Sequence, residues 1–279
     1  MAGQTDSDTR VLADGKLLVD EPAERVLRLT ISNLEKRNAL DHPILDAITA
    51  TLAEHSGPDG AIRCLVLTGA GGMFSAGYDI GEIPEGEGEF EEQAERLVAH
   101  PFTEAIEALE AFPWPTLAAL PGHTIGGGLE LALTCDMRIA QEGIKLGMPP
   151  ARLGLVYSHT GLRRFIDAIG AARTRELFLL GKYIDASTAL GWGLVNRVIP
   201  AADLAALAGE LAGELAGNAP LAQLGNKRVI GALLRAEGRL EEDVERELIE
   251  LRRASFASAD MREGMRAFAQ RRAPEWRNE

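Results

Sequence analysis

The feature that most constrains the fold is a run of three glycines between a short apolar strand and an apolar helix. The segment Gly122–Asp136 reads GHTIGGGLELALTCD, and residues 116–122 before it have the apolar pattern of a strand. Glycines at this point are expected to form a tight turn, which permits close approach of backbones and leaves N–H groups pointing into a cleft. The helix that follows carries one carboxylate, Glu130, in an otherwise apolar run.

A similar arrangement occurs earlier in the chain. Residues 62–69 (IRCLVLTG) read as an apolar strand, and the turn-rich stretch after it has six glycines between Gly71 and Gly88. Before it, alternation over residues 11–32 predicts strands, and residues 41–55 have helical spacing with an N-cap residue at the start. The repeated succession of strand, glycine loop and helix indicates an α/β protein.

The second half of the chain is mainly helical by pattern. A helix is also expected over residues 91–112, interrupted at Pro101, and a short strand within residues 194–199. From Ala201 onward the spacing of apolar and charged residues is that of helices that pack one face and solvate the other. No low-complexity linker separates this helical part, so it is expected to dock on the rest or to serve assembly.

Composition excludes several classes of function. The 29 basic and 42 acidic residues give a formal charge of −13, which repels phosphodiester backbones, so no nucleic acid partner is expected. The sequence has no run of about 18 apolar residues and no secretory signal pattern, so we expect no membrane partner and a cytoplasmic location. Cys64 and Cys135 lie in apolar runs and are expected to be buried free thiols; no metal site is predicted.

The glycine loops do not match the patterns of nucleotide-binding proteins. Neither has the G-x-G-x-x-G arrangement with its acidic partner, and no G-x-x-x-x-G-K-[ST] exists. Backbone N–H groups at Gly127 and around Tyr78 could instead point into one cleft and form an oxyanion hole. The alternative, that both loops are tight turns without a ligand, stays open on these residues alone.

Four motifs taken together resemble the enoyl-CoA hydratase/isomerase, or crotonase, superfamily. They occur in the family's order and cover nearly the whole chain: NLEKRNAL (33–40), FSAGYDI (74–80), GGGLELALTCD (126–136) and EGMRAFAQRR (263–272). The resemblance implies an α/β fold made of a crotonase-like spiral of ββα repeats with a C-terminal helical trimerisation region. Residues 1–200 would form the core that binds acyl-CoA, and residues 201–279 the helical assembly region of a homotrimer or homohexamer.

The resemblance also implies where the substrate lies. By motif position, the carbonyl oxygen of an acyl-CoA thioester would lie between the backbone N–H groups of Tyr78 and Gly127, with the CoA adenine near the backbone of Ala76. Two preorganised N–H donors would stabilise the thioester enolate, and loss of one such donor costs roughly 10²–10³ in rate. CoA is part of the substrate, and no further cofactor is expected.

The chain departs from the family's hydratases at one of their two catalytic glutamates. Glu130 matches the first glutamate. The second lies in a motif resembling P-E-x-x-L-G, and in the corresponding PPARLG (149–154) Pro150 replaces it. Proline cannot titrate, whereas general acid–base catalysis contributes typically about 10²–10⁴ in rate. Efficient hydration, and isomerisation by the same position, are therefore not expected.

The segment around Pro150 is more similar to the methylmalonyl-CoA decarboxylases of the superfamily, which carry T-P-x-x-L-G-x-x-Y and S-A-G-H-D-I. Tyr157 falls on the tyrosine of the first pattern. Tyr78 replaces the histidine of the second; its backbone amide can keep the oxyanion role, but the bulkier ring is expected to alter the acyl pocket. The walls of that pocket are expected from residues 82–100.

These residues favour a lyase that decarboxylates a short malonyl-type CoA thioester such as methylmalonyl-CoA. Loss of CO2 leaves electrons in the enolate, so the step needs no base. Tyr157 would orient the carboxylate and supply a proton, and Glu130 would act as a polar orienter or proton relay. His159 and Arg152 are expected to be peripheral. Two alternatives stay open: an enoyl-CoA hydratase/isomerase with a single glutamate, and a non-catalytic scaffold that binds acyl-CoA.

Overall fold

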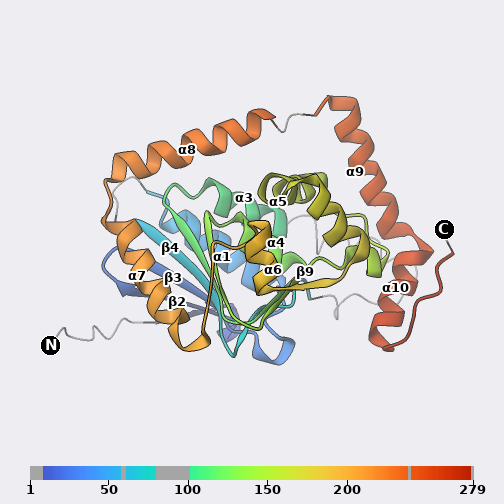
Figure 1. Cartoon of the computed structure of the whole chain (residues 1–279), viewed down its shortest axis with the longest axis horizontal. Coiled ribbons are helices and arrows are strands. Elements are labelled where there is room, and N and C mark those ends of the chain that lie inside the picture. Colours follow the sequence, from blue (N-terminus) through green and yellow to red (C-terminus); the bar gives the residue numbers. More distant parts are fainter. Residues whose placement is uncertain (1–8, 58–60, 80–100, 238–239, 278–279) are drawn as a thin grey trace.

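The computed structural model describes residues 9–57, 61–79, 101–237 and 240–277. Its strands form two sheets (Figure 1). The seven-stranded sheet has the order β1 (Arg10–Leu12), β2 (Leu17–Ala23), β3 (Val26–Ile31), β4 (Cys64–Gly69), β6 (Thr116–Leu120), β8 (Met137–Gln141), β11 (Arg197–Ile199). The four-stranded sheet has the order β10 (Tyr183–Asp185), β9 (Lys145–Gly147), β7 (His123–Ile125), β5 (Met73–Ser75).

The two sheets are built together, because consecutive strands alternate between them. The pairs β4/β5, β6/β7 and β8/β9 each place their first strand in the large sheet and their second in the small sheet. From β3 to β11 the large sheet is parallel, as the small sheet is from β5 to β9. A helix follows β7, which completes a ββα unit. This is the α/β spiral of ββα repeats that the resemblance implied.

The short strands of the small sheet were not evident from the sequence pattern. β5 and β7 lie within the stretches that the pattern predicted as glycine loops. Each has three residues, which is too few to show an alternation of period two. Their pairing depends on neighbouring strands, and β7 contacts both β5 and β9.

The helices have the bounds α1 (His42–Glu54), α3 (Pro101–Ala111), α4 (Gly127–Thr134), α5 (His159–Leu180), α6 (Ala186–Trp192), α7 (Leu204–Gly217), α8 (Pro220–Glu237), α9 (Glu242–Ala257) and α10 (Ala259–Ala269). Asp41 caps α1, accepting from the Ile44 N–H at 3.0 Å, as the sequence predicted. In the described residues α3 begins at Pro101; residues 91–100 of the predicted helix lie outside them.

The large sheet is buried on both faces. Side chains on one face, including Leu29, Leu67 and Leu120, belong to the main apolar core. On the other face Val66 and Leu117 pack with Leu211 of α7 and its neighbours. Both faces of these parallel strands are therefore apolar, as expected for a covered parallel sheet. Helix α7, the first long helix after residue 200, thus takes part in packing the sheet; the division of the chain into domains at residue 200 stays a prediction.

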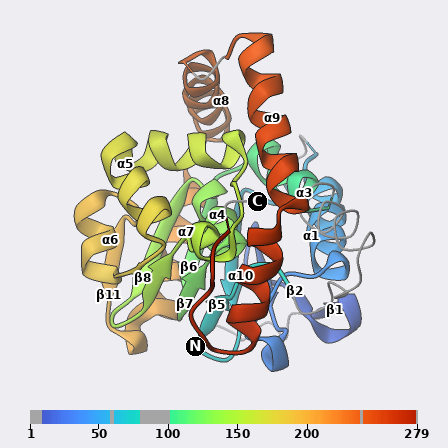
Figure 2. The same ribbon diagram turned by 90° about the vertical axis from the view of Figure 1, so that its right-hand side faces the viewer.

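The last three helices extend from α7 around the molecule. Helix α8 has no buried residue and runs along the top of Figure 1, and α9 descends at the right of the picture toward α10. Figure 2 faces the side on which α9 and α10 lie. Helix α10 packs on the 3-10 turn Pro150–Leu153, where the backbones of Gly154 and Met261 approach closely. No helix of the described segments has the length and apolar character needed to cross a membrane.

Candidate active site

The two glycine loops meet at the N-terminal end of α4. A Cβ added at Gly77 would lie 3.0 Å from the Ile125 oxygen and 3.3 Å from the Gly127 nitrogen, and Gly77 has φ +96°. Glycine is therefore required there both by conformation and by space. Within the described residues, neither the Tyr78 N–H nor the Gly127 N–H donates to another backbone group. The structure thus brings together the two amides that the motifs predicted, although their oxyanion role stays a prediction.

The segment 33–40 holds the first loop in place. Its Asn38 has φ +57° and donates from the side-chain amide to the oxygens of Ala70 and Met73, at 2.9 and 2.8 Å. Its Leu40 N–H donates to the Gly77 oxygen at 2.7 Å. The Ala76 N–H donates to the Arg37 oxygen at 3.1 Å. The first motif therefore fixes the loop geometry, and the predicted CoA contact at Ala76 stays a prediction.

Glu130 lies in the first turn of α4 and is 3% exposed. It accepts a hydrogen bond from the Tyr157 hydroxyl on Oε2 and one from Arg164 Nη1 on Oε1, the latter at 3.2 Å. Burial raises the pKa of Glu130, opposed by the Tyr157 hydrogen bond and by the charges of Arg164 and Arg252. A carboxyl group in this setting favours the protonated state more than an exposed glutamate does.

Tyr157 reaches Glu130 from the segment between the 3-10 turn and α5. Its ring packs edge-on against Phe178, with centroids 5.4 Å apart, and the residue is 7% exposed. The preceding Val156 N–H donates to the Ser255 Oγ at 3.0 Å, which ties the segment to α9. Burial and the neighbouring Glu130 raise the pKa of Tyr157 well above its usual value. The phenol is therefore a neutral hydrogen-bond donor.

Tyr78 contributes its ring to the site as well as its backbone. A Cβ added at Gly127 would lie 3.0 Å from two atoms of that ring. The ring packs edge-on against Phe102, with centroids 4.6 Å apart, and against the cluster of Phe256 and Met261. Burial, followed by the charge of Glu130, raises the pKa of the phenol. Two phenols and one carboxyl group therefore lie together beside Gly127.

Two residues of the site were missed by the sequence analysis. Arg164 of α5 bridges two carboxylates, donating from Nη2 to the Glu110 Oε2 at 2.7 Å and from Nη1 to Glu130. Gly161 lies one turn earlier, and an added Cβ would be 2.6 Å from Tyr157 Cε1 and 2.8 Å from Glu130 Oε1. The only sequence signal was the three-residue spacing of Gly161 and Arg164, which places both on one helix face.

The other candidates lie elsewhere. His159 pairs with Glu245 at 3.3 Å, and the side chain of Arg152 packs beside Gly181. Neither contacts Glu130 in the described part of the chain. Pro150 is buried at the start of the 3-10 turn, so that position supplies no carboxyl group.

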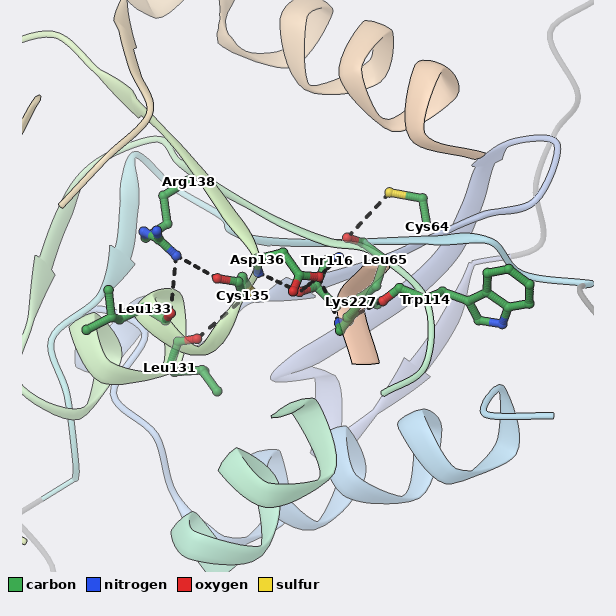
Figure 3. Close-up of polar contacts among 10 residues, drawn as sticks. All are labelled: Cys64, Leu65, Trp114, Thr116, Leu131, Leu133, Cys135, Asp136, Arg138 and Lys227. Atoms are coloured by element: carbon green, nitrogen blue, oxygen red, sulfur yellow. Dashed lines mark hydrogen bonds and ion pairs between the residues drawn. The ribbon is translucent and has the colours of Figure 1, made fainter. Parts of the chain in front are cut away.

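A second polar cluster lies at the opposite end of α4 (Figure 3). Arg138, 8% exposed, donates to the oxygens of Leu133, Cys135 and Leu194 at 3.1, 2.6 and 2.8 Å. Two of these oxygens belong to the C-terminal end of α4, where a cation is favourable. Burial lowers the pKa of Arg138. The Arg138 guanidinium therefore provides hydrogen bonds to carbonyl oxygens at the C-terminal end of the buried helix α4.

Asp136 completes this second cluster. Its Oδ2 accepts from the N–H and hydroxyl of Thr116, at 2.7 and 3.0 Å, and from Lys227 Nζ at 2.7 Å. Lys227 also donates to the Trp114 oxygen at 2.9 Å and so ties α8 to the sheet (Figure 3). The neighbouring thiols are free and buried, as predicted, and burial raises the pKa of Cys64 and Cys135 to about 12.

Comparison with known proteins agrees with this architecture. A sequence model of the family described as enoyl-CoA hydratase/isomerase matches residues 21–279, so the chain belongs to that family. A probable enoyl-CoA hydratase of Mycobacterium bovis is 34% identical over 264 residues, covering 92% of this chain and 96% of that protein. The chain is therefore an acyl-CoA enzyme of the crotonase superfamily.

Two solved structures that are similar to this chain have names that state different reactions. A methylmalonyl-CoA decarboxylase in complex with 2-nitronate-propionyl-CoA is similar with a TM-score of 0.85 at 27% identity, over 95% of this chain and 99% of that one. An enoyl-CoA hydratase from Bacillus anthracis is similar with a TM-score of 0.74 at 30% identity, over 95% and 100%. The backbone is thus more similar to this decarboxylase, and the sequence slightly more similar to this hydratase.

Proposed function

We propose that this enzyme removes CO2 from a short malonyl-type CoA thioester, such as methylmalonyl-CoA. The observation that carries the proposal is the buried hydrogen bond from Tyr157 to Glu130, with Pro150 in place of the second glutamate of the hydratases. The higher TM-score to a methylmalonyl-CoA decarboxylase supports it. The candidate site therefore offers one phenol donor and one buried carboxyl group. These two groups suit enolate formation better than addition of water.

The reaction follows from these groups. The bond between the α-carbon and the carboxylate breaks, its electron pair enters the thioester as an enolate, and CO2 leaves. The N–H groups of Tyr78 and Gly127 stabilise the charge on the enolate oxygen. A proton then passes to the α-carbon from the Tyr157 phenol, and the phenol regains it from Glu130, which exchanges with solvent. The sum consumes one proton and yields CO2 and the shorter acyl-CoA, with no cofactor beyond the CoA of the substrate.

The raised pKa of Glu130 supports the last step. A protonated Glu130 can return a proton to Tyr157, whereas an exposed glutamate would be ionised at neutral pH. Arg164 holds the opposite oxygen of the carboxyl group, so Oε2 is directed to the phenol. The pair therefore forms an oriented proton donor.

Hydration or isomerisation by Glu130 alone is the second candidate. The name of the curated relative favours it, and a buried carboxyl group can also activate water. Without a second carboxyl group, Glu130 would have to act first as the general base and then as the general acid.

Incubation in D2O separates the candidates. The protein is mixed with methylmalonyl-CoA, ethylmalonyl-CoA, malonyl-CoA or crotonyl-CoA, and product masses are followed over time. We expect loss of CO2 with one deuterium at the α-carbon. Water added to crotonyl-CoA without CO2 loss would establish the hydratase, and binding of CoA esters without any product would establish the non-catalytic scaffold.

A variant pair tests the assigned phenol. Tyr157→Phe should lower decarboxylation by about tenfold or more while acyl-CoA binding changes little, because the hydroxyl is lost and the ring is kept. Tyr183→Phe is the matched control, since that tyrosine is 48% exposed on β10. A wild-type rate in Tyr157→Phe would remove this residue from the mechanism.

We also propose that the enzyme assembles as a homotrimer or homohexamer. Helix α8 buries no side chain in the single chain, and it exposes Leu221, Val229, Ile230 and Leu233. Light scattering after size-exclusion chromatography gives the mass directly, and a single-chain mass would contradict the proposal.

A further inference from the structure

The side chain of Arg252 is a cation without an anionic partner among the described residues. Its Nε is buried and makes no hydrogen bond in the described part of the chain. The guanidinium lies over the Phe256 ring, 5.7 Å from the centroid. A cation–π contact stabilises such a group but gives its buried Nε–H no hydrogen-bond acceptor. A buried guanidinium nitrogen with no acceptor is costly unless a ligand supplies one.

Arg252 faces the candidate active site. Phe256, one helical turn further along α9, packs in the same cluster as the Tyr78 ring. The positive charge of Arg252 acts on both Glu130 and Tyr78. The nearby Arg164 is already engaged with Glu110 and Glu130. Of the two cations whose charge opposes the rise in the pKa of Glu130, Arg252 is therefore the one without an ion pair within the described residues.

The substrate of the proposed reaction brings the anion that this cation lacks. A malonyl-type thioester carries a free carboxylate next to the α-carbon, and this group must enter beside Glu130 and Tyr157. A substrate carboxylate that leaves water for this site needs a compensating charge. A guanidinium is well suited to a carboxylate because it offers paired donors.

We infer that Arg252 recognises the free carboxylate of the thioester and so determines specificity for malonyl-type over uncarboxylated acyl-CoA. This assignment rests on the proposed function and deepens it. The contact holds the carboxylate in the ground state and until CO2 has left in the transition state, so it stabilises both about equally and acts on KM rather than on kcat. Helix α9 would thereby supply a specificity residue to a site built mainly from residues 33–164.

The test compares Arg252→Gln with wild type, using methylmalonyl-CoA and propionyl-CoA as probes. We expect the KM for methylmalonyl-CoA to rise about tenfold or more, with kcat changed less than about threefold. Calorimetric binding of propionyl-CoA should be unchanged. Arg252→Lys should restore part of the loss, and Arg246→Gln, on the same helix and 68% exposed at its side chain, is the matched control.

Each result has a distinct meaning. An unchanged KM in Arg252→Gln, or an equal loss of affinity for both thioesters, would overturn the inference; equal loss would indicate contact with the CoA moiety. Binding measured by calorimetry does not require turnover. If wild type prefers methylmalonyl-CoA through Arg252 but releases no CO2, the proposed function fails and the recognition stands. If CO2 is released while Arg252→Gln keeps the preference, only the recognition fails. Thermal unfolding of each variant reports whether it is folded.

Discussion

Helix α4 has a polar cluster at each end, with Glu130 buried at one and Arg138 at the other, and the two clusters satisfy their charges differently. At the C-terminal end the donors of Arg138 go to main-chain oxygens, and Asp136 accepts from Thr116 and Lys227. At the N-terminal end Glu130 is held by side chains that can exchange protons or move.

The difference separates polar residues that hold the fold together from polar residues that serve the candidate active site. Hydrogen bonds to backbone oxygens fix one geometry, because the acceptors cannot titrate and are placed by the fold. The N-terminal cluster instead combines a carboxyl group with a raised pKa, a phenol, and a guanidinium nitrogen without a partner in the described residues. Perturbed groups in such a setting are typical of functional sites. The distinction would be contradicted if substitutions at the C-terminal end changed mainly catalysis and substitutions at the N-terminal end changed mainly stability.

The largest expected effect is on turnover in Glu130→Gln. Glutamine keeps an oxygen that can accept from Tyr157, but it has neither the charge nor the proton of the acid. We expect kcat to fall by about 10²–10⁴ with no loss of free energy of unfolding, since a desolvated ionisable group has been removed. Asp136→Asn, at the other end of α4, should lower the free energy of unfolding and leave kcat per folded molecule unchanged. A Glu130→Gln chain that does not fold would make this residue structural.

The next effect is on stability in Arg138→Met. Methionine cannot donate to the three oxygens that Arg138 now satisfies, and unsatisfied buried acceptors cost about 1–3 kcal/mol each. We expect the free energy of unfolding in urea to fall by roughly 3 kcal/mol or more, with kcat per folded molecule retained. Arg10→Met removes an exposed pair with Glu54 and should cost about 1 kcal/mol or less. Equal losses in both variants would contradict the assignment.

A smaller effect on activity is expected from Gly161→Ala. The added methyl group would lie within 2.8 Å of both Tyr157 and Glu130, so one of them must shift. A displacement in the site should lower kcat/KM about tenfold or more. The control is Gly213→Ala on α7, where nothing lies within 4 Å of the added atom. That change should stabilise the helix by about 0.5–1 kcal/mol without an effect on kcat/KM.

The smallest expected signal is thiol labelling of the native protein. Cys64 and Cys135 are buried, and their pKa of about 12 leaves a thiolate fraction of about 10⁻⁴ at pH 8. We expect no reaction with a maleimide at pH 8 on the timescale at which urea-unfolded chains are fully labelled, with mass spectrometry as the readout. Arg138→Met should speed labelling because it destabilises the same end of α4. Rapid native labelling would mean that this end opens locally.

The sequence determined the features that depend on residues close together in the chain. The N-cap of α1, the apolar strands β4 and β6 and the glycine turn before α4 were predicted, because caps, alternation and turn residues act over a few positions. The motifs also named Glu130 and Tyr157, which the structure brings into contact. Their catalytic roles stay predictions.

Only the tertiary structure placed the residues that complete the site. Arg164 hydrogen-bonds to Glu130 from α5, and the charge of Arg252 on α9 opposes the rise in the pKa of that carboxyl group. The Tyr78 ring lies against Gly127 because Phe102 and Phe256 pack on it. No local pattern carries such information, because these side chains meet through the packing of helices on sheets rather than through spacing along the chain. The strands β5 and β7 form for the same reason: three residues specify a strand only when a neighbouring strand pairs with them.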